Sequence, residues 1–250
     1  MSIDVVDLRN FYSQRLGVVT RRIVSAAIRH HWPDARGQCV IGIGYTTPYL
    51  GIFRDNAERC LAFMPAQQGV LKWPTARPTK SALVDEYQLP LADSSVDRLL
   101  LVHALEVSDD PESLLREMWR VLSPSGRLLV VVPNRRGLWV RTDHTPFGHG
   151  RPYSRAQITQ LMRQTWFTPA QWSEALYMPP WRGQWVLRSA SIWERFGAAV
   201  SSPFSGLHLI EANKQVYRAV PMRRERKRLI PALEPVLAPT PSSRTPSSGT

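Results

Sequence analysis

Cysteine is scarce in this chain, and so are long apolar runs. The chain has two cysteines in 250 residues, Cys39 and Cys60, and neither lies in a CxxC or histidine-rich pattern. Both lie in or beside short apolar runs, so we expect buried, reduced thiols and no metal site. No apolar run approaches the roughly 18 residues of a membrane span. Asp4 and Asp7 stand where an export leader would be basic. We therefore expect a cytoplasmic protein without a membrane span.

Acidic residues are also few, so the formal net charge is +12, from 32 Lys and Arg against 20 Asp and Glu. A basic chain attracts polyanions such as nucleic acids, acidic lipid headgroups and acidic proteins. Part of the excess is local, because residues 221–250 hold six basic and two acidic residues. That stretch passes from arginine and lysine into Pro, Ser and Thr, which cannot form a packed core. We predict a disordered tail over 221–250.

The residues before the tail alternate between strand and helix patterns. Strands are predicted at 40–44, 60–64, 81–84, 96–102, 128–132, 172–178 and 208–220. Helices are predicted at 7–32, 48–57, 111–122, 154–166 and 189–200. This alternation predicts an α/β domain with a mostly parallel sheet over residues 37–220, and the last two strands can pair antiparallel at its edge. Residues 1–36 are expected to form a helix that packs on this core, with Phe11 and Tyr12 in the core or at a pocket edge.

The stretch 38–50 combines a strand, a glycine turn and a helix start. The apolar run from Val40 ends at Gly44, and Thr47-Pro48 suits the opening of a helix. Free amides at such a helix start favour a polar or anionic ligand group. Two glycines are equally compatible with a plain connecting turn. Ligands of parallel sheets bind outside the carboxyl ends of the strands, where this turn would lie.

A longer pattern downstream is more specific. Asp85 is followed by Leu89-Pro90 and then by a buried strand. A helix and a further strand come next, with the pattern E-x-x-R-x-L-x-x-x-G over residues 117–126. In this order the elements resemble the class I S-adenosylmethionine-dependent methyltransferases of the small-molecule type, over residues 38–220. The resemblance implies a Rossmann-like seven-stranded sheet with helices on both faces and the last strand antiparallel. It also implies S-adenosylmethionine as cofactor, lying across the carboxyl ends of the first strands.

The family's acid-x-Gly-x-Gly-x-Gly motif falls on the glycine turn. Of its pattern the chain retains Gly44; Gly42 stands in place of the acid, and Thr46 and Pro48 stand in place of glycines. The motif is therefore atypical, and the helix start at Thr47-Pro48 is expected to contribute more to cofactor binding than the glycines.

The family's ribose-binding acid is missing as well. It would fall near Met64, where loss of a charge-assisted contact removes roughly 1.5–3 kcal/mol, about one to two decades of affinity. Gln67 or Gln68 is a partial substitute. Asp85 matches the acid beside the adenine, and Leu89 packs near it. The cofactor contacts implied are Gly42, Gly44, Tyr45, Thr47, Met64, Asp85, Leu89 and His103.

The residues after the fifth strand are expected to face the acceptor. Methyl transfer from a sulfonium depends mainly on in-line positioning, although oxygen or nitrogen acceptors can need a base. His144 or His149 is the candidate base, and Tyr153 is a candidate hydrogen-bond donor. The same histidines can equally bond backbone carbonyls within a loop, and His103 is open to the same two interpretations.

Six of the nine tryptophans lie after Arg136, among several arginines. Such a segment can bind a lipid-like acceptor or stack bases, and it can equally form a core and a protein interface. No recognised nucleic-acid-binding motif accompanies it. Three functions follow: a methyltransferase acting on a small or lipid-like acceptor, a binding or regulatory protein of the same fold without cofactor use, and an RNA methyltransferase that charge alone supports.

Overall fold

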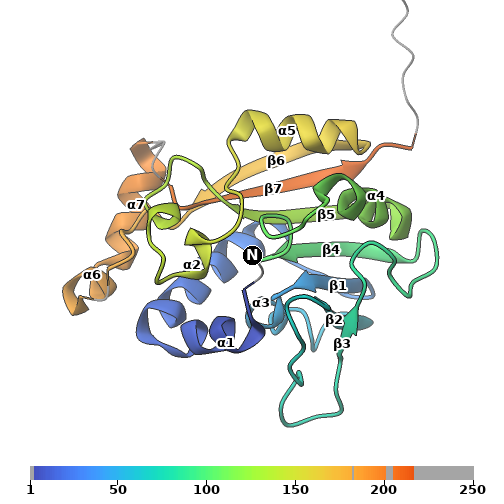
Figure 1. Ribbon diagram of the computed structural model, residues 1–250, viewed down its shortest axis with the longest axis horizontal. Helices are drawn as coiled ribbons and strands as arrows, with labels where there is room; N and C mark the ends of the chain where they lie inside the picture. Colours follow the sequence, from blue (N-terminus) through green and yellow to red (C-terminus); the bar gives the residue numbers. More distant parts are fainter. Residues whose placement is uncertain (1–2, 182, 201–204, 217–250) are drawn as a thin grey trace, which may run out of the picture. The chain divides into compact units, whose positions relative to one another are not determined.

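A computed structural model describes residues 3–181, 183–200 and 205–216, and the predicted tail 221–250 lies outside them. The strands are β1 (Cys39–Gly44), β2 (Arg59–Pro65), β3 (Ser81–Val84), β4 (Val96–Val102), β5 (Leu122–Pro133), β6 (Phe167–Ala175) and β7 (Leu207–Lys214). They form one seven-stranded sheet in the order β3-β2-β1-β4-β5-β7-β6 (Figure 1). The pairings among β1 to β5 are parallel, and β7 runs antiparallel to both of its neighbours. The predicted fold class is therefore confirmed.

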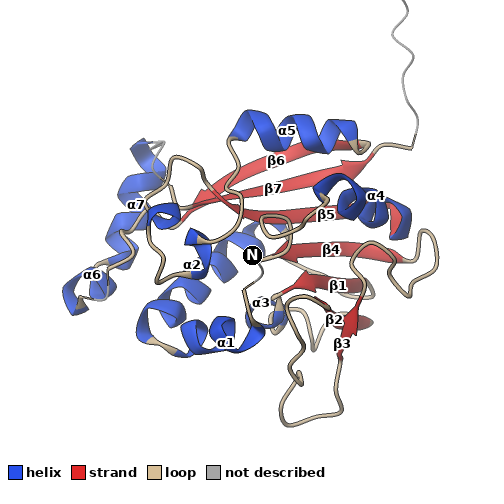
Figure 2. Cartoon of the chain, viewed as in Figure 1, coloured by secondary structure: helices blue, strands red, loops and turns tan. Residues whose placement is uncertain are grey.

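Helices cover both faces of the sheet (Figure 2). They are α1 (Val5–Ser13), α2 (Arg15–His31), α3 (Thr47–Leu50), α4 (Pro111–Val121), α5 (Arg155–Gln164), α6 (Gln184–Arg188) and α7 (Ala190–Val200), with short 3₁₀ turns η1 (Trp139–Arg141) and η2 (Pro146–Gly148). Alternate strand residues face opposite clusters of the core: Val40 packs with the α1 and α2 side chains, and Ile41 with those of α4 and α5. Each buried strand thus contributes to both clusters, as its unbroken apolar run predicts.

Several predicted boundaries were wrong for identifiable reasons. The helix predicted at 7–32 is two helices, because Gln14 is extended (φ −77°, ψ 160°). A side chain on Gly17 would put its Cβ 2.0 Å from the Phe11 carbonyl oxygen, so the two helices meet closely at this break. The helix predicted at 48–57 is the four-residue α3, followed by hydrogen-bonded turns up to Ala57. The strand predicted at 172–178 spans 167–175. The helix predicted at 189–200 is confirmed as α7, and the preceding α6 was not predicted.

Among the described residues, no helix is both long and apolar enough to cross a membrane. The same part of the chain holds no group of three or more His, Cys, Asp or Glu residues arranged to hold a metal ion. Cys39 and Cys60 are both free thiols.

The buried thiol of Cys60 gives a testable pH dependence. Its Sγ lies 3.8 Å from the Leu50 carbonyl oxygen, and burial raises the thiol pKa from 9.0 to about 11. Because the folded pKa is the higher one, the stabilisation is complete below pH 9 and is lost as the pH rises through 11. Between pH 8 and pH 11, ionisation of the Cys60 thiol should lower the free energy of unfolding by about 2 kcal/mol. Urea unfolding at pH 8 and pH 11 measures the change. Cys60→Ala should show a smaller fall, and an equal fall in both proteins would contradict the assignment.

Candidate functional site

The carboxyl ends of β1 to β4 meet at one edge of the sheet, as parallel strands must. A polar or glycine residue that the sequence singles out lies at or just beyond the end of each strand: Gly44 at the end of β1, Gln68 after β2, Asp85 after β3 and His103 after β4. Strand β1 pairs with β2 on one side, where Ile43 lies opposite Phe63. It pairs with β4 on the other side, where Gly44 lies opposite Val102. These four positions are therefore neighbours across the edge.

The turn after β1 requires glycine at position 44. Gly44 has φ +85°, and a Cβ there would lie 2.3 Å from the Val102 carbonyl oxygen of β4. The Thr46 amide then donates to the Gly44 carbonyl at 3.0 Å, which closes a tight turn before α3. Only glycine allows the backbones of β1 and β4 to approach this closely.

The helix start differs from the expectation in two respects. The N-cap residue is Thr46 rather than Thr47, and its hydroxyl makes no capping bond. With four residues, α3 aligns few peptide dipoles, so its N-terminus attracts an anion weakly. The prediction that the helix start outweighs the glycines has no geometric support here.

Gly42 and Thr46, two of the departures from the family motif, are packed against each other. A Cβ at Gly42 would lie 2.1 Å from the Thr46 Oγ1. Thr46, which stands in place of a motif glycine, therefore fills the space next to Gly42, which stands in place of the motif's acid. The Thr46 hydroxyl is fully buried and has no hydrogen-bond partner among the described residues.

This packing predicts coupling between the two positions. Gly42→Ala should destabilise the fold by about 2 kcal/mol, because the new methyl group overpacks against Thr46. Adding Thr46→Gly should recover at least half of that loss, since it vacates the space. Urea unfolding of the two single variants, the double variant and the parent gives the coupling free energy. Strictly additive effects would show that the two residues do not compete for this space.

The end of β2 presents an amide where the family has a ribose-binding acid. Met64 is buried, and its Sδ accepts from the Leu71 amide at 3.4 Å. The Gln68 Nε2 donates to the His103 carbonyl at 2.9 Å. Because a carbonyl must receive a donor, the other amide atom of Gln68 is the oxygen. This Oε1 is buried and has no hydrogen-bond partner among the described residues.

The end of β4 carries a buried histidine and carboxylate that face α1. The His103 Nε2 lies 2.8 Å from the Tyr12 hydroxyl, and its Nδ1 lies 3.3 Å from the Glu106 Oε1. A carboxylate beside Nδ1 favours the proton on that nitrogen, which leaves Nε2 free to accept from Tyr12. Neither carboxylate oxygen of Glu106 has a hydrogen-bond partner within the described ranges. His103 therefore bonds locally to Tyr12 and lies beside Glu106 at the carboxyl edge.

Aromatic side chains cover this group from the α1 side. The Tyr12 ring stacks on Tyr45 at a centroid distance of 5.6 Å, and its hydroxyl lies 2.7 Å from that of Tyr49. Phe147 of η2 lies against the His103 ring, with centroids 4.8 Å apart. Burial, with the neighbouring tyrosines adding to it, raises the pKa of Tyr12 well above its usual value. Tyr12 is thus a neutral hydrogen-bonding group that shields the site from water.

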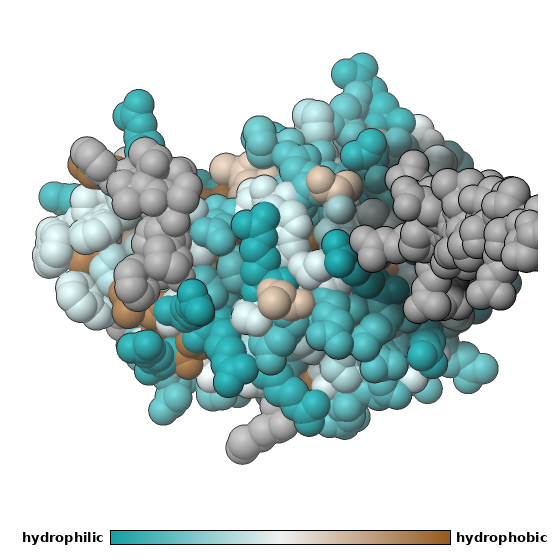
Figure 3. Space-filling model, turned by 90° about the horizontal axis from the view of Figure 1, so that it is seen from above, coloured by the Kyte–Doolittle hydropathy of each residue, from teal (hydrophilic) through white to brown (hydrophobic). Residues whose placement is uncertain are grey.

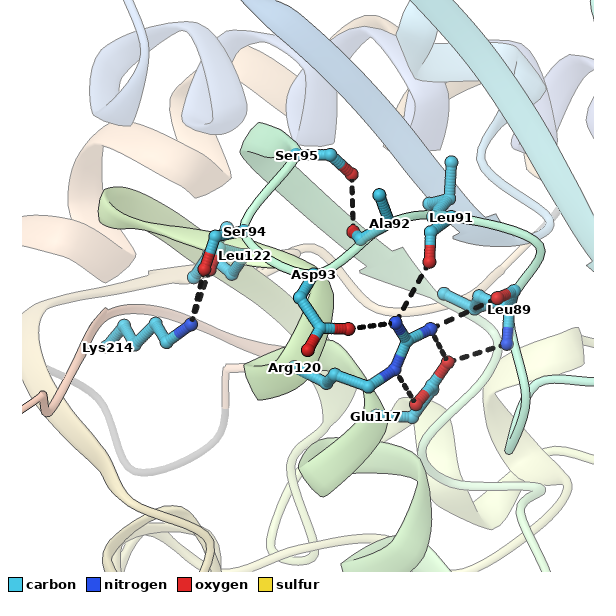
Figure 4. Close-up of polar contacts among 10 residues, drawn as sticks. All are labelled: Leu89, Leu91, Ala92, Asp93, Ser94, Ser95, Glu117, Arg120, Leu122 and Lys214. Carbon is cyan, nitrogen blue, oxygen red and sulfur yellow. Dashed lines mark hydrogen bonds and ion pairs between the residues drawn. The ribbon is translucent and has the colours of Figure 1, made fainter.

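The loop after β3 is held by two residues of the downstream motif (Figure 4). Glu117 accepts the Leu89 amide at 2.6 Å, while Arg120 donates to the Leu89 and Leu91 carbonyls at 3.1 and 2.9 Å. The same guanidinium pairs with Glu117 at 2.6 Å. The exposed Asp85 carboxylate accepts a hydrogen bond from the Tyr87 amide at 2.9 Å. Together with this loop, Asp85 lines an open hollow of about 850 Å³. The E-x-x-R pattern therefore fixes the loop that follows Asp85.

The three predicted acceptor-side residues are only partly brought together. His144 and His149 both line a cavity of about 400 Å³ beside α1, and each lies near a backbone carbonyl, of Pro180 at 3.2 Å and Asp143 at 3.0 Å. Tyr153 lies apart, with its hydroxyl 3.4 Å from the Leu105 carbonyl. Burial first and Glu106 second raise the pKa of Tyr153 to about 12, so it serves as a donor and not as a base.

Residues 40–130 match the protein family described as Methyltransferase domain. A protein of Mycolicibacterium smegmatis named Probable S-adenosylmethionine-dependent methyltransferase is 35% identical over 82 residues, which are 32% of this chain and 32% of that protein. The chain thus covers about a third of that relative's length.

Solved structures with the same fold cover more of the chain. A methyltransferase of Thermotoga maritima, described as a possible histamine N-methyltransferase, has a TM-score of 0.64 at 18% identity and covers 84% of this chain and 96% of its own. A methyltransferase of Haloferax volcanii, solved with the Trm112 activator, has a TM-score of 0.59 at 20% identity, with 86% and 100% covered. Geranyl diphosphate C-methyltransferase of Streptomyces coelicolor A3(2) has a TM-score of 0.53 at 15% identity, with 76% of each chain covered.

The strand order, the antiparallel β7 and the glycine turn define a class I methyltransferase fold. Residues 40–130 match the methyltransferase domain family, and the chain is similar in sequence over 82 residues to an S-adenosylmethionine-dependent methyltransferase. S-adenosylmethionine is the cofactor of this family.

The residues at the carboxyl edge fit this cofactor in chemistry. S-adenosylmethionine carries an ammonium group and two ribose hydroxyls, which are hydrogen-bond donors. In the described part of the chain, the edge offers two buried acceptors without hydrogen-bond partners, Gln68 Oε1 and Glu106 Oε2. Gly44 keeps the backbone turn of the motif, and Asp85 offers an exposed carboxylate after β3.

The sequence did not point to Glu106, and it left Tyr12 either in the core or at a pocket edge. His103 and Glu106 lie three residues apart directly after a buried strand, and this spacing is a signal that could have indicated the carboxylate. The contact between Tyr12 and His103 joins residues 91 positions apart, and no local pattern predicts it.

Proposed function

We propose that this chain transfers a methyl group from S-adenosylmethionine to a small or lipid-like acceptor. The observation that carries the proposal is a pair of buried acceptor oxygens, Gln68 Oε1 and Glu106 Oε2, which have no hydrogen-bond partner among the described residues. Each such atom costs about 1–3 kcal/mol when nothing donates to it. Donors of a ligand at this edge offset the cost, and the cofactor of the family carries the matching groups.

Each contact has a role in this proposal. Asp85 receives the adenine amino group, Gln68 Oε1 a ribose hydroxyl, and Glu106 the ammonium group, while Gly44 lets the backbone approach. When bound, the cofactor supplies a methyl group on a positively charged sulfur. Replacing the usual ribose-binding acid by the neutral Gln68 weakens this contact, because a charged acceptor binds more strongly than an amide oxygen.

Three histidines are candidate bases in this proposal: His103, His144 and His149. Glu106 holds its Nδ1 side and leaves Nε2 as acceptor towards the Tyr12 hydroxyl. His144 and His149 each use Nε2–H for a backbone carbonyl, so each keeps Nδ1 as an acceptor beside the cavity of about 400 Å³. The lining of that cavity combines apolar Ile3, Phe11 and Pro146 with carboxylates, which suits an acceptor with an apolar part and a donor group.

The test measures S-adenosylhomocysteine formed when the protein is incubated with S-adenosylmethionine and one of three acceptor pools: polar small molecules, a lipid extract, or total RNA. We expect product above the acceptor-free blank with one of the first two pools, and at least a tenfold loss in His103→Gln. Glu112→Gln, an exposed change on α4, is the matched control. Product with RNA alone would identify an RNA methyltransferase. No product with any pool, from a protein that binds the cofactor, would favour a binding or regulatory role.

A further inference from the structure

The segment from Pro179 to Val200, here called the α6/α7 arm, exposes large apolar side chains. Trp181 is 58% exposed, Trp185 64%, Ile192 55% and Trp193 39%. Figure 3 shows pale and hydrophobic residues gathered at the end of the molecule that carries α6 and α7, while the rest of the view is mainly hydrophilic. Tryptophan is rarely left this exposed, and a patch of this kind marks an interaction site.

The arm has two distinct faces, so this exposure follows from how it packs. On the inner face, Val186 and Ala190 are buried in the core cluster. Glu194 lies on the same face, and its carboxylate accepts the amides of residues 176 to 178 at 2.8 to 3.4 Å. A Cβ on Gly197 would lie 2.2 Å from the Tyr177 ring, so this helix is held closely. Among the arm's side chains that the structure describes, those that hold it to the body lie on this inner face.

The outer face is apolar and basic. Trp185, Arg188, Ile192 and Arg195 follow one another at spacings of three, four and three residues, and all are exposed. Glu194 is the single acidic residue in the sequence from 179 to 200, and it is turned inward. The outer face thus offers tryptophan and isoleucine beside arginine, with no carboxylate among them.

We propose that the α6/α7 arm docks on an anionic lipid surface. A helix with Trp and aliphatic residues beside arginine matches the boundary between headgroups and acyl chains, where the indole ring lies at the interface and the guanidinium meets phosphate. The arm also lies beside the acceptor-side cavity, because His144 bonds the Pro180 carbonyl at its root. Docking would bring that cavity close to the lipid. The proposal does not depend on methyl transfer, and its test reads binding alone.

The experiment is sedimentation of the full-length chain with vesicles of phosphatidylcholine alone, or with about 30% phosphatidylglycerol, at about 0.15 M salt. We expect the chain to sediment with the anionic vesicles. The double variant Trp185→Ser/Ile192→Ser should lower the partition constant by at least about tenfold, and Arg188→Glu/Arg195→Glu should do the same. Trp166→Ser is the matched control, since Trp166 is 46% exposed at the opposite end of β6. Thermal unfolding verifies that each variant is folded.

Three results would overturn the proposal. The first is a wild-type chain that stays in the supernatant with anionic vesicles. The second is binding that survives both arm variants but is lost when the basic residues from Arg223 to Arg228 are changed to glutamine in the full chain. The third is self-association that the arm variants abolish, in a chain without vesicle binding, because the occupant would then be a second copy.

Discussion

Gly44→Ala is expected to produce the largest loss of stability of any single substitution in the site. Position 44 needs φ +85°, which costs an L-residue about 1–2 kcal/mol. The added Cβ would also lie 2.3 Å from the Val102 carbonyl oxygen, a backbone atom that cannot move without breaking the β1–β4 pairing. We expect a total loss of at least about 3 kcal/mol. Urea unfolding measures it.

Gly37→Ala is the matched control for this prediction. Gly37 has φ +66°, yet a Cβ there meets nothing within 4 Å. Its substitution should therefore show the conformational cost alone, about 1 kcal/mol. The difference between the two variants isolates the close approach of β1 and β4. Equal losses would mean that the turn is not shaped by that contact.

Arg120→Met is expected to destabilise the protein by about 3 kcal/mol. It removes the charge that compensates Glu117, whose side chain is 9% exposed. It also removes the donors to the Leu89 and Leu91 carbonyls, so the loop that follows Asp85 loses its attachment to α4 (Figure 4). Unfolding in urea gives the stability change, and a faster hydrogen exchange of the residues 85–93 would report the loosened loop.

Two further variants separate charge from simple truncation. Adding Glu117→Gln to Arg120→Met should recover about 1 kcal/mol, because the buried charge disappears while the acceptor for the Leu89 amide stays. Arg116→Met lies on the same helix and breaks an exposed pair with Glu112. It should cost about 0.5 kcal/mol or less. A similar cost for both arginines would show that Arg120 is an ordinary surface residue.

The strands were predictable because each one carries its own signal. The strands at 81–84 and 96–102 coincide with β3 and β4. For β4 the reason is a largely buried run of Val and Leu. The helix break at Gln14 was not predictable, because the apolar spacing continues through it. It arises where Gly17 meets the Phe11 carbonyl, a contact that depends on three-dimensional packing.

The candidate site was predictable where a residue acts through the backbone or follows a strand. Gly44, Asp85 and His103 lie at the carboxyl edge as the pattern indicates. Thr46 is different: it looks like a defect of the motif in the sequence, whereas in the structure it packs against Gly42. Glu106 depends on an environment assembled from α1, β4 and η2, which no single stretch of sequence describes.

The central claim is that the carboxyl edge binds S-adenosylmethionine through buried acceptors, and calorimetric titration of the full-length chain with S-adenosylmethionine tests it most directly. We predict saturable binding with one site per chain, weakened about tenfold by Gln68→Ala. Gln67→Ala, the exposed neighbour of the same residue type, should leave the affinity within about twofold of the parent. No heat and no thermal stabilisation at millimolar ligand, or equal losses in the two glutamine variants, would contradict the claim.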